Sequence, residues 1–307
     1  MRYNPDNELK QAIELALSLE RPLLLTGDPG CGKTTAAYWA AWMLGAAPQP
    51  AKDSDPRAVH IQVRSDTTAK SLKYDFDAIR YFRDAQLSMQ PNSTVKWDQA
   101  PETKQKYITE GPLWKAFRAE GDVVLLFDEI DKAPPDLPND LLLELDRFRF
   151  EVPELEKEID RDTSDGRRIL CIITSNGQRP LPDAFLRRCL HHHIDMDMDT
   201  IKDVVNRRLV DSNSDGDTDG DIILDKVLCD FANAQFDKLL QVSRLLHRPG
   251  LGVLLTWLQA ISLDPSGLLA AYEKDLGGDG DLSNLPHLQA LLKNSQDLKV
   301  IKAKGQR

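Results

Sequence analysis

Apolar runs and amphipathic stretches alternate along the first two thirds of the chain. The apolar runs long enough to form one buried strand each are residues 22–26, 58–64, 123–127 and 168–177. Apolar residues recur at helical spacing before the first run, in residues 7–19, and again after it, in residues 33–44. Strands that alternate with helices favour a parallel sheet covered by helices, so the pattern predicts an α/β core.

The spacing changes from residue 197 onward. The segments "TIKDVVNRRLV", "ILDKVLCDFANAQF" and "GVLLTWLQAI" all repeat their apolar positions with a helical period. This change predicts two domains, an α/β domain over residues 1–196 and a smaller all-α domain over residues 197–307.

Two excursions interrupt the α/β pattern. Residues 65–110 form an insertion in which residues 73–86 show helical spacing, and Gly111-Pro112 then begins another helix because proline is favoured at the first helical position. The second excursion, residues 150–168, is rich in charge and fits a hairpin or a flexible loop.

Two segments are rich in residues that can bind metal ions, but neither has the arrangement that a metal site requires. The acidic stretch 211–221 fits the start of a calcium loop in two frames, but position 12 is Ile222 or Lys226 where a bidentate glutamate is needed. We therefore interpret it as an acidic loop. The adjacent histidines at 191–193 alternate across a strand, which favours an edge strand over a metal site.

Composition and charge exclude several classes of partner and location. The formal net charge of −10 argues against nucleic acid or an anionic membrane as a partner. No run of 18 apolar residues is present, and the first ten residues lack an apolar signal core, which predicts a protein that is neither membrane-bound nor exported. The four cysteines are scattered without a CxxC pair, as expected in a reducing cytoplasm.

The segment between the first strand and the next helix matches the pattern GxxxxGK[ST] from Gly27 to Thr34. Its glycines let backbone N–H groups converge on a phosphate, and the following helix N-terminus favours negative charge. Lys33 would reach the β- and γ-phosphates, and the hydroxyl of Thr34 would bind Mg²⁺. A plain strand–helix turn is the alternative. The predicted nucleotide-binding residues here are Gly27, Asp28, Pro29, Gly30, Cys31, Gly32, Lys33, Thr34 and Thr35.

Carboxylates follow the apolar strand at residues 123–127. Because ligands bind beyond the carboxyl ends of strands in open α/β sheets, Asp128 is predicted to hold Mg²⁺. Glu129 would accept a proton from the attacking water. An acidic helix N-cap is the alternative interpretation of this pair.

Two later segments add polar groups at similar strand and helix ends. Asn176 follows the strand at residues 168–177 and could hydrogen-bond a γ-phosphate or the attacking water, unless Asn176-Gly177 only makes a turn. Arg187 and Arg188 end a short helix, where they could cap it or reach the nucleotide of a neighbouring subunit.

The order of "LLLTGDPGCGKTT", "FDEIDKAP", "ITSN" and "FLRRC" resembles that of the AAA+ ATPases, and more narrowly of their MoxR-type branch. "GPLWKAF" and "HRPGLGVLLTWLQAI" resemble that branch too, so the likeness extends over residues 7–261. The resemblance implies a P-loop AAA+ core, with a parallel sheet flanked by helices, followed by an all-α lid domain.

By this resemblance Asn176 is the first sensor and Arg188 the arginine finger, with Arg187 as the second choice. Arg248 stands where the lid's second sensor is expected, although the Gly-Ala-Arg signature of other AAA+ groups is missing. The resemblance also implies a homo-oligomeric ring, a hexamer, that binds ATP and Mg²⁺ and remodels a client or adaptor protein, often one with a von Willebrand factor A domain.

Two other functions stay open at this stage. One is a scaffold in a defence or signalling assembly, in which nucleotide binding drives oligomerisation with little turnover. An intact Glu129 favours the hydrolase over that scaffold. The other is a motor on nucleic acid, which the acidic charge disfavours. The residues do not decide between ATP and GTP.

Overall fold

The chain folds into two units in a computed structural model. The described residues are 3, 5–45, 58–89, 100–161, 166–196, 198–210, 222–243, 245–276 and 281–304. The first unit comprises Met1–Gly27 and Gly32–Ile194, and the second comprises Asp28–Cys31 and Asp195–Arg307. The turn at Asp28–Cys31 therefore groups with the second unit although its flanking residues belong to the first.

A five-stranded parallel sheet lies at the centre of the first unit, in the order β2-β5-β8-β1-β9. Its central strands β5 and β8 are buried along their whole length, as parallel strands covered on both faces should be. The predicted parallel α/β core is confirmed. The strands are β1 (Leu23–Thr26), β2 (Ala58–Gln62), β5 (Val123–Asp128), β8 (Ile169–Ser175) and β9 (Leu190–His193).

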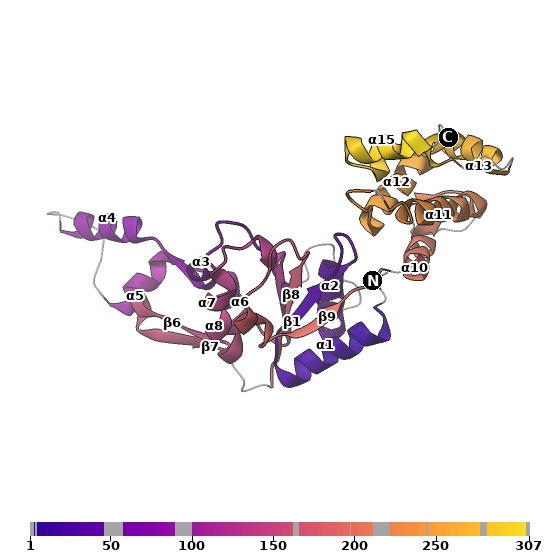
Figure 1. The fold of residues 1–307 in the computed structure, drawn as a ribbon. Helices are drawn as coiled ribbons and strands as arrows, with labels where there is room; N and C mark the ends of the chain where they lie inside the picture. The colour runs from indigo at the N-terminus through magenta and orange to yellow at the C-terminus, as the bar shows by residue number, and fades with distance from the viewer. Residues whose placement is uncertain are drawn as a thin grey trace. The chain divides into compact units, whose positions relative to one another are not determined.

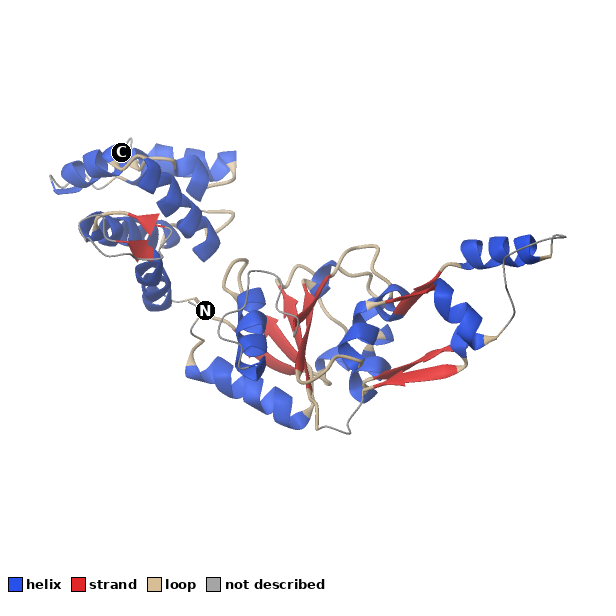
Figure 2. Ribbon diagram, turned by 180° about the vertical axis from the view of Figure 1, so that it is seen from behind, coloured by secondary structure: helices blue, strands red, loops and turns tan. Residues whose placement is uncertain are grey.

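Helices cover both faces of this sheet (Figures 1 and 2). Helices α1 (Asn7–Leu19) and α2 (Lys33–Gly45) lie on one side, and α6 (Pro112–Phe117) lies on the other. The side chain of Asp6 caps α1 by accepting a hydrogen bond of 2.6 Å from the backbone N–H of Leu9. Helix α6 begins at the proline that the sequence indicated.

A strand occupies the first part of the helix predicted over residues 73–86 of the insertion. Residues Tyr74–Phe76 form β3, which pairs antiparallel with β4 (Ile108–Glu110). The helix α4 (Ala78–Ser88) starts later because Asp77 caps it, accepting a 2.8 Å hydrogen bond from the N–H of Arg80. Figure 1 shows α4 at the end of the unit away from the sheet. The insertion also contains α3 (Ala69–Lys73), α5 (Pro101–Lys104) and a 3₁₀ turn at Gln105–Tyr107.

The second excursion is a β-hairpin. Strands β6 (Arg149–Val152) and β7 (Lys157–Asp160) pair antiparallel, which selects the hairpin from the two predicted possibilities. Phe150 is buried and contacts the rings of Trp114 and Phe117 on α6, so the hairpin extends the core. Short helices precede it, namely Ile130–Lys132 (3₁₀), α7 (Leu137–Asp140) and α8 (Leu142–Arg147).

The second unit is mainly helical, as predicted, and has its own core around Trp257. The indole N–H of Trp257 donates a 2.8 Å hydrogen bond to the carbonyl of Pro286. A short parallel pair, β10 (Leu209–Val210) and β11 (Ile222–Ile223), was not expected. The acidic stretch 211–221 lies outside the described residues. The helices are α10 (Met198–Arg208), α11 (Lys226–Leu240), α12 (Leu251–Leu263), α13 (Ser266–Leu276), α14 (Leu288–Leu291) and α15 (Ser295–Lys304).

Across the described ranges, no helix taken singly has the length and apolar character needed to cross a bilayer. The segments Leu251–Leu263 and Ser266–Asp275 meet those criteria only when joined, and they are bent by 105° relative to each other.

Candidate functional site

The glycine-rich loop joins the carboxyl end of β1 to the start of α2. Gly30 and Gly32 have φ angles of +84° and +96°, a conformation that side chains rarely adopt. At Gly32 space is restricted as well, because a Cβ atom would lie 3.0 Å from the ring of Tyr3. These positions therefore require glycine, and the loop keeps its backbone free of side chains where it turns into α2.

Lys33 is the first residue of α2 and is only 6% exposed. Its Nζ donates a 2.8 Å hydrogen bond to the carbonyl oxygen of Gly27 at the other end of the loop. The ammonium group thus lies across the loop. It brings a positive charge to the place where converging backbone N–H groups would bind an anion.

Asp128 at the carboxyl end of β5 has three side-chain partners. Its Oδ1 accepts hydrogen bonds from the hydroxyls of Thr34, at 2.9 Å, and Thr174, at 2.6 Å. Its Oδ2 lies 3.4 Å from Nε2 of His60. Burial raises the pKa of this carboxyl, but the bonds from His60, Thr174 and Thr34 outweigh burial and lower the pKa below its ordinary value. Asp128 is therefore a carboxylate at neutral pH.

Glu129 follows in a left-handed conformation, with φ 60° and ψ 51°, which turns the chain sharply after β5. The backbone N–H of Glu129 donates to Oγ1 of Thr174 at 2.8 Å, which ties this turn to β8. Its Oε2 accepts a 2.8 Å hydrogen bond from Nε2 of Gln62 and a short one from Nζ of Lys132. Its Oε1 accepts one of 3.3 Å from Nδ2 of Asn176.

Asp131 holds the turn that carries Asn176. It is only 3% exposed, and its two carboxylate oxygens accept hydrogen bonds from the backbone N–H groups of Asn176, at 3.3 Å, and Gln178, at 3.0 Å. The segment after β5 therefore positions the end of β8. This arrangement brings the amide of Asn176 to the carboxylate of Glu129.

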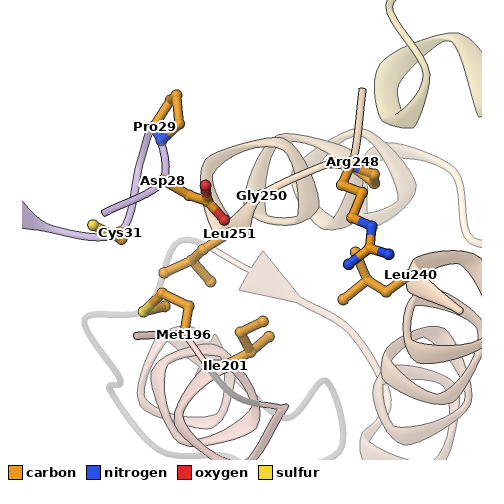
Figure 3. A pocket seen from close by; sticks show the side chains of 10 residues that line it. Asp28, Pro29, Cys31, Met196, Ile201, Leu240, Arg248, Gly250 and Leu251 are labelled. Carbon is orange, nitrogen blue, oxygen red and sulfur yellow. The ribbon is translucent and has the colours of Figure 1, made fainter. Parts of the chain in front are cut away.

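A pocket of about 160 Å³ lies within the second unit (Figure 3). Apolar side chains line it, those of Met196, Ile201, Leu240 and Leu251 among them, together with the turn at Asp28–Cys31. Figure 3 shows the side chains of Asp28 and Arg248 on opposite sides of this pocket. An apolar pocket with a few charged groups at its rim is the usual form of a small-molecule site.

Residues 22–189 match the AAA domain of the dynein-related subfamily. The chain belongs to this family. Membership in the AAA family makes the protein a nucleotide-binding AAA+ ATPase at the level of the family. A comparison with curated proteins gave no match.

Two solved structures are similar to this AAA protein over different lengths. A crystal structure from Cytophaga hutchinsonii, assigned as an ATPase, is 15% identical with a TM-score of 0.40, and the match covers 96% of this chain and 78% of that one. The ADP complex of Hsp104 from S. cerevisiae is 19% identical with a TM-score of 0.38. That match covers 66% of this chain and 35% of the Hsp104 chain.

The arginine pair of the AAA domain lies at another part of the first unit's surface. Nε of Arg188, just beyond α9 (Asp183–Leu186), donates to Oδ2 of Asp146 at 2.9 Å, and one of its terminal nitrogens donates to the carbonyl of Ala184. Arg187 beside it is exposed. The structure therefore brings Thr34, Asp128, Glu129 and Asn176 into one bonded group through Thr174, and Lys33 precedes Thr34 at the start of α2. The arginine pair does not join this group within the described chain.

Several residues that contact the bonded group were missed in the sequence. His60 and Gln62 are two residues apart on β2, so their side chains lie on the same face of the sheet. Two polar residues at this spacing in an otherwise apolar strand could have indicated that they belong to a site. Thr174 was recognised only as part of a strand end. The role of Asp131 in holding Asn176 depends on a contact between separate segments, which no local pattern reveals. Lys132 is only three residues from Glu129, but its ion pair with Glu129 was also missed.

Proposed function

We propose that this AAA protein hydrolyses ATP with Mg²⁺ at the carboxyl ends of β1, β5 and β8. The observation that carries the proposal is the hydrogen-bonded group that joins Thr34, at the start of α2 directly after the glycine-rich loop, to the two acidic residues at the end of β5. The hydroxyl of Thr34 lies 2.9 Å from Asp128, and Asn176 lies 3.3 Å from the adjoining Glu129. The hydrogen bonds thus connect the start of α2, directly after the phosphate loop, to the ionised carboxylate of Asp128, the candidate base Glu129 and the amide of Asn176.

The chemistry of Thr34 and Asp128 fits Mg²⁺. Both supply oxygen atoms, and Mg²⁺ is commonly bound through one or two protein ligands together with substrate phosphates. Within the described ranges no group of three or more His, Cys, Asp or Glu side chains is placed to hold a metal ion, which is compatible with so small a protein contribution. When bound, Mg²⁺ neutralises charge that develops on the phosphate oxygens.

The other residues of the group have separate roles in this proposal. The loop from Gly27 to Gly32 cradles the phosphates with its backbone N–H groups, and Lys33 adds its charge to the β- and γ-phosphates. Glu129 accepts the proton of the attacking water, while Asn176, hydrogen-bonded to Glu129, orients that water or the γ-phosphate. Thr35 continues the loop into α2.

The same proposal assigns residues 1–196 to nucleotide binding and residues 197–307 to a lid. Arg248 would be the second sensor of that lid. Its place in the pocket of the second unit, beside apolar side chains and the turn at Asp28–Cys31, suits a ligand with both charged and apolar parts.

We further propose a MoxR-type ring, a hexamer, in which Arg188 acts on the ATP of the adjacent subunit. The side chain of Arg188 is 41% exposed in its pair with Asp146, and so exposed a pair contributes at most about 1 kcal/mol. Arg188 can therefore exchange Asp146 for a phosphate at little cost. Arg187 is the alternative finger. The ring would remodel a client or adaptor protein, with one carrying a von Willebrand factor A domain as the first to test.

One observation favours a second candidate function, a scaffold that oligomerises on binding nucleotide and turns it over slowly. Lys132 forms an ion pair with Glu129, so the candidate base is neutralised by a cation in this state. If that ion pair persists when nucleotide is bound, the protein would bind the nucleotide, but Glu129 would accept a proton from water inefficiently.

The deciding experiment measures ATP hydrolysis with Mg²⁺ and with EDTA, for the unaltered chain and for Glu129→Gln. Glutamine keeps the shape of the side chain but cannot act as the base, so turnover should fall about 10²-fold or more while ATP still binds. Light scattering with and without ATP reports assembly in parallel. Equal turnover of the two proteins would contradict the role of Glu129, and ATP-driven assembly with negligible turnover would favour the scaffold.

A further inference from the structure

A chain of polar contacts links Oδ2 of Asp128, the oxygen that Thr174 does not contact, to helix α2. His60 on β2 lies with Nε2 3.4 Å from Oδ2 of Asp128, and its Nδ1 is 2.8 Å from the hydroxyl of Tyr38 on α2. The rings of Tyr38 and His60 meet edge to face, with their centroids 5.8 Å apart and their planes at 85°. Neither aromatic residue belongs to the bonded group proposed for catalysis.

The hydrogen-bonding capacities of these groups fix the direction of the chain. An ionised carboxylate can only accept, so in the neutral ring Nε2 carries the proton that faces Asp128. The Nδ1 atom of that ring is then an acceptor, and the Tyr38 hydroxyl donates to it. Tyr38 thereby selects the form of the His60 ring that can donate to Asp128.

The contacts also connect α2 to the sheet at two points, both of them on Asp128. Thr34 and Tyr38 are four residues apart on α2 and therefore lie on the same face of the helix, one turn from each other. Thr34 contacts Oδ1 of Asp128 directly, while Tyr38 reaches Oδ2 through His60. Both oxygens of the carboxylate are thus held from the same helix.

We infer that Tyr38 and His60 are positioning residues that orient the Asp128 carboxylate for Mg²⁺. The inference rests on the proposed function, because it takes Thr34 and Asp128 as the residues that hold the ion. A hydroxyl that binds a cation with its lone pair still has its proton to donate, and the direction of that proton depends on where Oδ1 of Asp128 lies. Groups that orient metal-binding side chains in this way typically alter metal affinity 10- to 100-fold when removed.

The test measures binding of a fluorescent, non-hydrolysable ATP analogue, first in EDTA and then during a titration with Mg²⁺. His60→Ala should raise the Mg²⁺ concentration needed for half-maximal enhancement by about 10-fold, with the affinity in EDTA unchanged. His60→Gln, whose amide N–H can replace Nε2, should recover part of this loss. Tyr38→Phe keeps the ring but loses the hydroxyl, and should give an intermediate shift.

Trp42→Phe is the matched control, since Trp42 lies one turn further along α2 and its indole N–H has no hydrogen-bond partner among the described residues. It should leave the Mg²⁺ titration unchanged. A Mg²⁺ requirement within about twofold of the unaltered chain in both His60→Ala and Tyr38→Phe would overturn the inference. So would an equal loss of affinity with and without Mg²⁺, which marks a general effect on folding. If the unaltered chain binds no analogue, the proposed function fails first, and the inference fails with it.

Discussion

Nε2 of Gln62 donates a 2.8 Å hydrogen bond to Oε2 of Glu129, joining the end of β2 to the residue directly after β5. The register of the two strands makes this contact possible, because Gln62 is paired with Asp128 in the parallel ladder. The candidate base is therefore held by a neighbouring strand as well as by Lys132 and Asn176. Its freedom to accept a proton depends on how easily these donors release it.

Gln62→Ala should raise the turnover of ATP. The substitution removes one donor from Oε2 of Glu129, and a hydrogen bond to a charged group contributes about 1.5–3 kcal/mol, so an increase in kcat of about tenfold or more is expected. The KM for ATP should stay the same because Gln62 does not contact the loop at Gly27–Gly32. Steady-state kinetics provide the measurement, and an unchanged or lower kcat would show that the contact helps to position Glu129.

Lys33→Ala should weaken ATP binding by at least about tenfold. The substitution removes the buried ammonium group that crosses the loop to Gly27, and charge-assisted bonds contribute about 1.5–3 kcal/mol. Calorimetry measures the affinity directly. Lys115→Ala removes an exposed lysine of α6 and is the matched control, which should bind ATP as the unaltered chain does. Equal affinities for all three proteins would refute the phosphate-binding role of the loop lysine.

Thr174→Val should destabilise the protein in a pH-dependent way. Valine removes a fully buried hydroxyl that donates to Asp128 and accepts from the N–H of Glu129, at a cost of about 2–3 kcal/mol. The pKa of Asp128 is lowered in the folded state, so the stabilisation of its carboxylate is present above the ordinary pKa of 3.8 and is lost as pH falls through the folded value. The difference from the unaltered chain should therefore shrink in acid.

Urea unfolding at about pH 7 and at about pH 3, which lies below the ordinary pKa of 3.8, measures this difference where the contribution is fully present and where its loss has begun. Ser175→Ala is the control on the same strand. The hydroxyl of Ser175 accepts a hydrogen bond from the N–H of Gly177 and has no bond to Asp128, so its effect should not depend on pH in this range. A loss of stability in Thr174→Val that is the same at both pH values would contradict the prediction.

Arg188→Ala should bind ATP normally and hydrolyse it about 10³-fold more slowly or worse, because arginine fingers contribute that much to phosphoryl transfer. If Arg188 acts on the adjacent subunit, mixing Arg188→Ala with Lys33→Ala protomers should restore activity where an intact loop borders an intact finger. Asp146→Asn, which removes the partner of Arg188 but not its charge, should keep activity. Lack of rescue in mixtures shown to co-assemble would exclude action in trans and leave Arg187 to be tested.

The sequence predicted those parts of the site that depend on neighbouring residues. The strand, glycine-rich loop and helix from Leu23 to Gly45 follow from apolar runs and from glycines whose backbone angles exclude other residues. The acids after β5 and the asparagine after β8 were predicted because parallel strands bring their carboxyl ends to one edge. The hairpin at β6 and β7 was one of two possibilities, and the buried side chain of Phe150 explains why it forms.

The parts that could not be predicted depend on which strands become neighbours. His60 and Gln62 contact the acidic pair only because β2 lies beside β5 in the sheet, although more than sixty residues separate them in the chain. Helix α4 confirms the helical spacing from residue 78 onward, but at residues 74–76 that spacing was misleading, since Tyr74 is buried in the core and its strand pairs with residues from the far end of the insertion. In that segment tertiary pairing outweighed local propensity.

The pairing of β3 with β4 affects which part of this protein can change in sequence and length during evolution. The backbone N–H of Asp77 donates to the carbonyl of Tyr107 at 2.8 Å, so the chain between them leaves and re-enters the domain at one place. Because the cost of closing such a loop grows only slowly with its length, residues 78–106 can be lengthened, shortened or exchanged while β2 and β5 keep their register. The two short strands thus fix both ends of an exchangeable insertion. The sequence of that insertion can evolve independently of the residues proposed to bind nucleotide.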